Sequence, residues 1–161
     1  MIFKSTESKE KKLNGRIAIK CNPNSETVGY LASLGIGFDC ASKKELQLVL
    51  NLGVDPSRII FAQPCKQPAF VRYAAQNKVS MMTFDNEDEL YKVKEYFPDA
   101  ELVLRILVDD SRSGLKLGLK YGAPLNTIPR LLKTAKALDL NVIGVRYVYN
   151  RKESTYSEKI K

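Results

Sequence analysis

The sequence alternates short apolar runs with amphipathic segments, and this alternation constrains the fold more than any other feature. Six runs of β-type residues recur at intervals of roughly 20 residues, the last interval being about twice as long. They cover 17–20, 38–41, 59–62, 81–84, 102–107 and 142–149. The runs are continuously apolar, as strands buried on both faces of a parallel sheet are. The pattern therefore predicts an α/β fold built from βα units.

The segments between the runs carry the start and stop signals of helices. The clearest is a capping box, in which the Ser42 side chain accepts a bond from the first turn, Glu45 reaches back, and Gly53 ends the helix over 42–52. Four more helices are predicted: 24–34, 67–77, one that begins at Asp85 or Asn86 and ends at Pro98, and one capped by Thr127.

Two architectures share this alternation, a doubly wound sheet and a (β/α)8 barrel, and periodicity does not choose between them. A closed barrel takes about 250 residues. The 161 residues of this chain would therefore form part of a barrel.

The chain contains no histidine, which excludes Ser-His and Cys-His nucleophile systems and HExxH zinc sites within it. Its three cysteines, Cys21, Cys40 and Cys65, have no CxxC spacing, so we expect reduced thiols and no metal site. Catalysis within the chain has to use Lys, Cys, Tyr, Asp, Glu or Arg.

The formal net charge is +8, and about half of this excess lies near the two ends. The body has no stripe of Arg and Lys interleaved with aromatic residues, so we expect no specific nucleic-acid binding. The sequence shows no membrane span or secretion signal, which favours the cytoplasm. We divide the chain into a charged extension over 1–15, a barrel segment over 16–149 and a charged tail over 150–161.

Several stretches resemble the eukaryotic ornithine decarboxylases and their inactive relatives, the antizyme inhibitors, over about residues 16–147. They read IAIKCNPN, LGIGFDCASKKELQLVLNLGVDPSRIIFAQPCKQ, YAAQNKVSMMTFDNEDELYKV, AELVLRILVDDS and LGLKYGAPL. The resemblance implies a partial (β/α)8 barrel of the alanine racemase type, with six of the eight βα units and parallel strands. It also implies pyridoxal 5′-phosphate as cofactor, a homodimer, and decarboxylation of ornithine to putrescine in polyamine synthesis.

The resemblance assigns site residues. The family motif YAxKCN places the Schiff-base lysine at Lys20 and a cofactor contact at Ala18. A lysine after the apolar residues 17–19 is also expected at the C-terminal end of a buried strand, where barrel chemistry is found. The alternative is a rim lysine that points into solvent. Asp39 in FDCAS matches a family aspartate close to that lysine, and Arg105 in LVLRI matches an arginine that lines the cofactor pocket.

Asp39 and two further residues that match family positions, Glu45 and Lys120, also have structural interpretations. The alternative for Asp39 is an N-terminal cap for the following helix. Glu45 matches a family glutamate near the site, although its capping-box role explains it. Lys120 in LGLKYG matches a family lysine at the dimer contact, and the alternative is an ordinary surface lysine.

The sequence departs from the family pattern at the sixth run. The family has a segment like SFHVGSG there, whose histidine stacks on the pyridoxal ring. This chain reads RYVYNR over 146–151, with Val148 at the position of that histidine. The sequence also lacks the family's phosphate loop and C-terminal domain. We therefore expect weak or absent cofactor binding and no activity of the chain alone.

A regulatory binding module is the alternative function. The family presents its antizyme-binding surface in the segment that matches 68–91. Arg72 lies in this segment, and Lys92 and Lys94 follow on the neighbouring helix. These three cations form a basic face for an acidic partner, or else an ordinary solvated surface. A decoy of this kind needs no cofactor. A full-length family member is a further possible partner, and a chain with no function of its own is the third interpretation.

Overall fold

The computed structural model describes residues 15–108 and 121–147, and the statements below concern these residues. The strands are β1 (Arg16–Ala18), β2 (Gly37–Cys40), β3 (Ile59–Phe61), β4 (Met81–Phe84), β5 (Glu101–Arg105) and β6 (Asn141–Arg146). The helices are α1 (Ser25–Ser33), α2 (Lys43–Asn51), α3 (Pro68–Gln76), α4 (Glu87–Tyr96) and α5 (Ile128–Ala137). Three single-turn 3-10 helices join them: η1 (Ile19–Cys21), η2 (Pro56–Arg58) and η3 (Leu125–Thr127).

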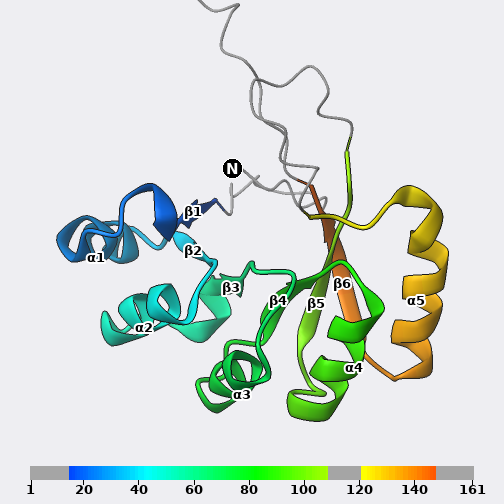
Figure 1. The fold of residues 1–161 in the computed structure, drawn as a ribbon. Helices are drawn as coiled ribbons and strands as arrows, with labels where there is room; N and C mark the ends of the chain where they lie inside the picture. The colour runs from blue at the N-terminus through cyan, green and yellow to red at the C-terminus, as the bar shows by residue number, and fades with distance from the viewer. Residues whose placement is uncertain (1–14, 109–120, 148–161) are drawn as a thin grey trace, which may run out of the picture.

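The strands form one parallel sheet in the order β1-β2-β3-β4-β5-β6. A doubly wound sheet reverses its strand order near the middle, and this sheet does not. Because strand-to-strand crossovers are right-handed, an unreversed order places successive helices on the same face. Figure 1 shows the helices following one another along one side of the curved sheet. The prediction of a partial (β/α)8 barrel is confirmed, and the doubly wound alternative is excluded.

The hydrophobic core lies between the sheet and the helices. Phe38 and Cys40 of β2, Phe61 of β3 and Phe84 of β4 point into it and are fully buried. Because side chains alternate along a strand, the residues between them lie on the opposite face of the sheet. We call that face the inner face. Its positions include Ala18, Asp39, Ile60, Thr83, Val103, Arg105 and Arg146.

Three strands end two or more residues earlier than the sequence predicts. β1 ends at Ala18 because the chain turns into η1, so Lys20 does not belong to the strand. β5 ends at Arg105, and Ile106 pairs with Ala123 in an isolated bridge. β6 ends at Arg146, and residues 148–149 of the predicted run lie outside the described part of the chain.

The capping box of α2 is confirmed. The Ser42 side-chain oxygen accepts a hydrogen bond from the Glu45 backbone N–H at 3.2 Å. The Glu45 carboxylate reaches back to the backbone N–H of Ala41, at 2.7 Å, one residue further than in the usual box. Gly53 follows with a φ of 75°, a left-handed conformation that a glycine adopts without strain. Glu45 therefore has the structural role that its spacing predicts.

The caps of α4 and α5 were predicted less accurately. Asn86 caps α4, since its side-chain oxygen accepts from the Glu89 backbone N–H at 3.0 Å, and Asp85 does not. Thr127 occupies the N-cap position of α5 as predicted, but its backbone is already helical and its side chain makes no cap bond. Its hydroxyl donates instead to the Pro124 carbonyl at 2.7 Å.

No helix in the described part of the chain is long and apolar enough to cross a membrane.

Candidate functional site

The candidate site residues gather on the inner face of the sheet. Ala18 of β1 stands beside Asp39 of β2 in the strand register, and Arg105 of β5 stands beside Arg146 of β6. Parallel strands bring side chains in register to the same face. The sheet therefore places one carboxylate on its second strand and two guanidinium groups on its last two strands.

Asp39 and Arg146 form an ion pair across the inner face. The Arg146 Nη2 donates to Asp39 Oδ2 at 2.6 Å, and the two side chains are 7% and 9% exposed, respectively. A buried charge-assisted hydrogen bond of this length is among the strong polar contacts in a protein. It joins strands β2 and β6, which three strands separate in the sheet. The alternative role for Asp39, as a helix cap, is wrong because Ser42 caps the following helix.

The charge of Asp39 also acts on two further arginines, Arg16 and Arg105. Burial lowers the pKa of Arg105, the positive charge of Arg146 lowers it further, and Asp39 is among the groups that oppose the shift. Burial also lowers the pKa of Arg16, with Asp39 opposing. The Arg105 guanidinium lies 5.1 Å from the centre of the Tyr121 ring. The inner face is thus an electropositive environment around one buried acid.

Lys20 lies in η1, two residues beyond Ala18. Its side chain is exposed, whereas the preceding Ile19 is buried. The prediction that Lys20 emerges directly from a buried strand is corrected, because the turn lifts it past the end of β1. It still lies at the C-terminal end of the parallel sheet, where barrel enzymes carry their chemistry. Its exposure is what a rim lysine shows, and its role as an imine lysine stays a prediction.

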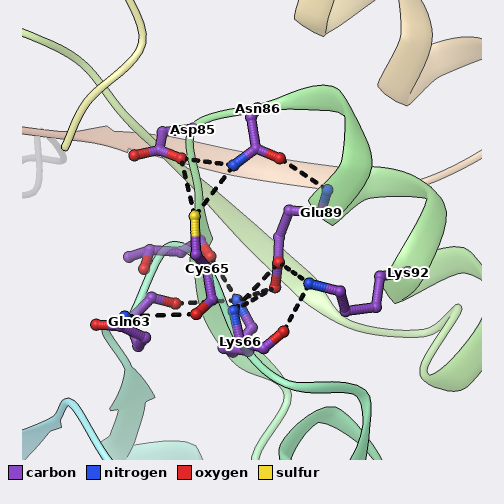
Figure 2. Close-up of polar contacts among 8 residues, drawn as sticks. Gln63, Cys65, Lys66, Asp85, Asn86, Glu89 and Lys92 are labelled. Carbon is purple, nitrogen blue, oxygen red and sulfur yellow. Dashed lines mark hydrogen bonds and ion pairs between the residues drawn. The ribbon is translucent and has the colours of Figure 1, made fainter. Parts of the chain in front are cut away.

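A second polar cluster, which sequence analysis missed, ties the loop after β3 to α4 (Figure 2). The Lys66 ammonium lies 2.7 Å from Glu89 Oε1, and both side chains are almost fully buried. Lys66 also donates to the carbonyls of Thr83 and Gln63, at 2.7 and 3.1 Å. Burial lowers the pKa of Lys66, and the charge and hydrogen bond of Glu89 oppose that shift. The cluster is a buried, hydrogen-bonded ion pair of the kind that holds a loop in one conformation.

Lys92 completes this cluster from the first turns of α4. Its ammonium lies 2.6 Å from Glu89 Oε2 and donates to the Lys66 carbonyl at 2.6 Å. A signal for the cluster exists in the sequence: Glu89 stands next to Leu90 and four residues before Val93, on the apolar stripe of the helix. An acid in that stripe needs a buried partner.

The exposed thiol of Cys65 lies next to this cluster (Figure 2). The Asn86 side-chain amide donates to Cys65 Sγ at 3.3 Å and to Asp85 Oδ1 at 2.9 Å. Asp85 Oδ2 accepts from the Gly122 backbone N–H at 2.9 Å, which attaches the end of β4 to the segment before α5. Partial burial and the Asp85 charge raise the pKa of Cys65.

The remaining candidate residues are not brought together with the inner face. Cys21 is exposed, and Cys40 is buried in the core, where desolvation raises the pKa of its thiol far above the usual range. The described residues contain no group of three or more potential metal ligands. Lys120 lies outside the described residues, so its predicted dimer contact stays a prediction.

Two of the three cations of the predicted basic face on α3 and α4 are exposed, and the third is partly buried. The Arg72 guanidinium stacks over the Tyr96 ring, 4.7 Å from its centre, and Lys94 is exposed. Lys92 is partly buried, and it shares the single carboxylate of Glu89 with Lys66. Arg72 and Lys94 are the exposed cations of this face, and the binding role of all three residues stays a prediction.

Comparison with known proteins identifies the family. The family model described as "Pyridoxal-dependent decarboxylase, pyridoxal binding domain" matches residues 3–147, which is most of the chain. This chain belongs to that family. Among curated relatives, it is 53% identical over 130 residues to the ornithine decarboxylase of Schizosaccharomyces pombe, covering 81% of this chain and 30% of the relative. It is 55% identical over 130 residues to antizyme inhibitor 2 of Xenopus laevis, covering 81% of this chain and 28% of the relative.

A solved structure confirms the barrel architecture of this pyridoxal-dependent decarboxylase family member. The arginine decarboxylase of Paramecium bursaria Chlorella virus, bound to agmatine, superposes with a TM-score of 0.83 at 37% sequence identity. The match covers 85% of this chain and 37% of the viral enzyme. The chain thus spans between 28% and 37% of the length of these relatives.

The described residues do not fit pyridoxal phosphate in this arrangement. The carboxylate of Asp39, which the resemblance places near the cofactor, is already bound to Arg146 at 2.6 Å within a buried pair. A ligand at that carboxylate has to displace the guanidinium and break a buried ion pair, which is costly. We therefore assign no catalytic step to this pyridoxal-dependent decarboxylase family member in the described state.

Proposed function

We propose that the chain is a barrel segment of ornithine decarboxylase type that does not decarboxylate ornithine on its own. Ornithine is the proposed substrate class because curated ornithine decarboxylases from fungi and mammals are 46–55% identical to the chain. Pyridoxal phosphate belongs to the family, and we propose that this chain binds it weakly. The observation that carries the inactivity is the ion pair between Asp39 and Arg146, which occupies the carboxylate that the cofactor region needs.

Carbon dioxide release tests this proposal. The purified full chain is given pyridoxal phosphate and carboxyl-labelled ornithine, and Lys20→Ala is the matched control. We expect the two proteins to release the same amount of label, because free pyridoxal phosphate alone accounts for it. Turnover by the unmodified chain that Lys20→Ala abolishes would overturn the proposal.

Association with a family member is part of the same proposal. A second copy of the chain or a full-length decarboxylase is the proposed dimer partner, with Lys120 at the contact. We place the chain in the cytoplasm, where the exposed thiols of Cys21 and Cys65 stay reduced. Co-purification of differently tagged copies, with and without Lys120→Glu, tests the contact. Equal recovery of both variants would contradict the role of Lys120.

Binding of antizyme is the second candidate function. The observations that favour it are the 55% identity to an antizyme inhibitor and the exposed cations of the α3–α4 face. Cations on a binding surface steer an acidic partner, and salt screens them over about 8 Å at physiological ionic strength. A decoy of this kind does not use the inner face, so the ion pair there does not oppose it.

Charge reversal tests this second candidate. Replacing Arg72 and Lys94 with Glu is expected to lower the association rate with antizyme at least tenfold. The same double reversal at Lys133 and Lys136, which are exposed on α5, is the charge-matched control. Lys20→Ala should leave binding unchanged. Absence of antizyme binding by the folded chain, or equal loss in both reversed variants, would eliminate the decoy.

A further inference from the structure

We propose that Arg146 is an intramolecular latch, whose guanidinium holds Asp39 and keeps the inner face closed to an external ligand. The inference concerns regulation of the proposed cofactor region and rests on the proposed function only for its choice of probe. It predicts that one side chain, rather than a general lack of binding groups, limits ligand access.

The first support is the reach of the contact. Asp39 and Arg146 are 107 residues apart in the sequence and meet at 2.6 Å. They belong to strands at opposite sides of the described sheet, β2 and β6, so neither the turn chemistry of one strand nor local propensity brings them together. Neighbouring strands lie about 4.8 Å apart, so an arginine side chain cannot reach from β6 to β2 along a flat sheet, and the curvature of the sheet brings the two groups together (Figure 1).

The second support is what lies between the two strands. The inner-face residues of β3, β4 and β5 include Ile60, Thr83 and Val103, and all three are buried. The Thr83 hydroxyl has no hydrogen-bond partner within the described residues. A buried hydroxyl of this kind is uncommon, and it leaves polar capacity behind the latch that a ligand can use.

The third support is electrostatic. Asp39 also attracts Arg16 and Arg105, although Asp85 acts more strongly than Asp39 on Arg105, and the direct contact of Asp39 is with Arg146. An external ammonium or imine cation has to compete for Asp39 with a guanidinium on the same chain. A tethered competitor acts at an effective concentration of millimolar or more, well above that of a typical cofactor in solution.

Because a ligand binds only while the site is open, the apparent affinity equals the affinity of the open site multiplied by the fraction of time that the site is open. A site that is open for a tenth of the time binds with a tenfold weaker apparent affinity, and opening it fully recovers that factor. Removing the guanidinium should leave Asp39 available while Arg16 and Arg105 remain to receive an anionic group. A small molecule that carries both an anionic group and a carbonyl fits this pattern, and pyridoxal phosphate is such a probe.

Reductive trapping at Lys20 tests the latch. In this assay the lysine amine adds to the probe aldehyde, water leaves, and borohydride delivers hydride to the resulting carbon–nitrogen double bond, which gives a stable secondary amine. The full chain and its variants are incubated with limiting pyridoxal phosphate, reduced and mapped by peptide mass spectrometry. Arg146→Ser is expected to raise the occupancy of Lys20 at least tenfold over the unmodified chain, with other lysines unchanged.

The matched control is Arg130→Ser, which removes the same charge from an exposed side chain on α5. It should leave Lys20 occupancy at the unmodified level. Equal occupancy of Lys20 in Arg146→Ser and Arg130→Ser would overturn the proposal, and so would full occupancy in the unmodified chain. If circular dichroism shows that Arg146→Ser does not fold, Arg146→Met takes its place with the same criteria, because its unbranched side chain fills much of the same space without donating a hydrogen bond to Asp39.

The test separates this inference from the proposed function. Carbon dioxide release by the unmodified chain would refute the proposed inactivity, whatever Arg146 does. Trapping at Lys20 that does not respond to Arg146 would refute the latch, whatever the chain catalyses.

Discussion

Glu89→Gln is the substitution with the clearest expected cost to stability. Glu89 accepts from the Lys66 ammonium at 2.7 Å, from the Lys92 ammonium at 2.6 Å and from the Lys66 backbone N–H at 3.2 Å. The amide keeps the shape of the carboxylate but removes its charge, which leaves the buried Lys66 without a counter-ion. Removing one partner of a buried pair destabilises a protein by about 3–5 kcal/mol.

Urea unfolding measures this cost. With a dependence of about 2 kcal/mol per molar urea, a loss of about 4 kcal/mol lowers the unfolding midpoint by about 2 M. Glu87→Gln is the control, because Glu87 pairs with Arg130 at 3.2 Å on the surface, where the two side chains are 30% and 70% exposed. An exposed pair contributes at most about 1 kcal/mol.

The pH dependence adds a second signature. Burial lowers the folded-state pKa of Lys66, so the folded protein releases this proton before the unfolded chain does. Below its folded-state pKa, Lys66 is charged in both states and opposes folding most strongly. Between that pKa and the unfolded value of about 10.4, only the unfolded chain keeps the proton, so the free energy of unfolding rises with pH. Loss of Glu89 removes the interactions that raise this pKa, so the variant regains stability from a lower pH than the unmodified chain does.

Two results would refute this reasoning. One is a Glu89→Gln midpoint within about 0.5 M urea of the Glu87→Gln midpoint, which would mean that the buried pair contributes little. The other is a variant whose loss of stability does not change with pH anywhere below about pH 10.4, which would mean that Lys66 is not the charge left unpaired.

Three further predictions concern single residues. Ser42→Ala removes the cap of α2 and should lower the free energy of unfolding by about 1 kcal/mol in urea titrations; no change would show that the cap bond at 3.2 Å is not stabilising. Gly122→Ala should cost at least about 2 kcal/mol in the same assay, because φ is 115° and a Cβ would lie 2.8 Å from a backbone nitrogen; a neutral result would contradict this geometry. In iodoacetamide alkylation at pH 8, the exposed Cys21 should react first, Cys65 more slowly because its pKa is raised, and the buried Cys40 after unfolding. Faster modification of Cys40 than of Cys65 would contradict that order.

The fold was largely predictable because its signals are local. Continuous apolar runs mark strands that are covered on both faces, and the capping box at Ser42 fixes the start of α2 within one residue. The choice between barrel and doubly wound sheet was not predictable from periodicity, because both architectures have the same βα alternation. Strand order decides it, and the resemblance to ornithine decarboxylases supplied that information.

The site was predictable only in part. Asp39 and Arg105 were placed at strand ends, and the register puts both on the inner face. The partner of Asp39 has no local signature, because Arg146 is 107 residues away and reads as one more cation in a basic chain. The turn that carries Lys20 beyond β1 was missed for a related reason, since the apolar run continues through the buried Ile19.

A double-mutant cycle on Asp39 and Arg146 tests the central claim most directly. Asp39→Asn, Arg146→Gln and the double variant are compared with the unmodified chain by urea unfolding. We predict that the two single losses do not add, with a coupling free energy of about 2–3 kcal/mol, because the two side chains meet in one buried bond across the inner face. Losses that add within about 0.5 kcal/mol would show that β2 and β6 do not meet there, and would contradict the closed inner face.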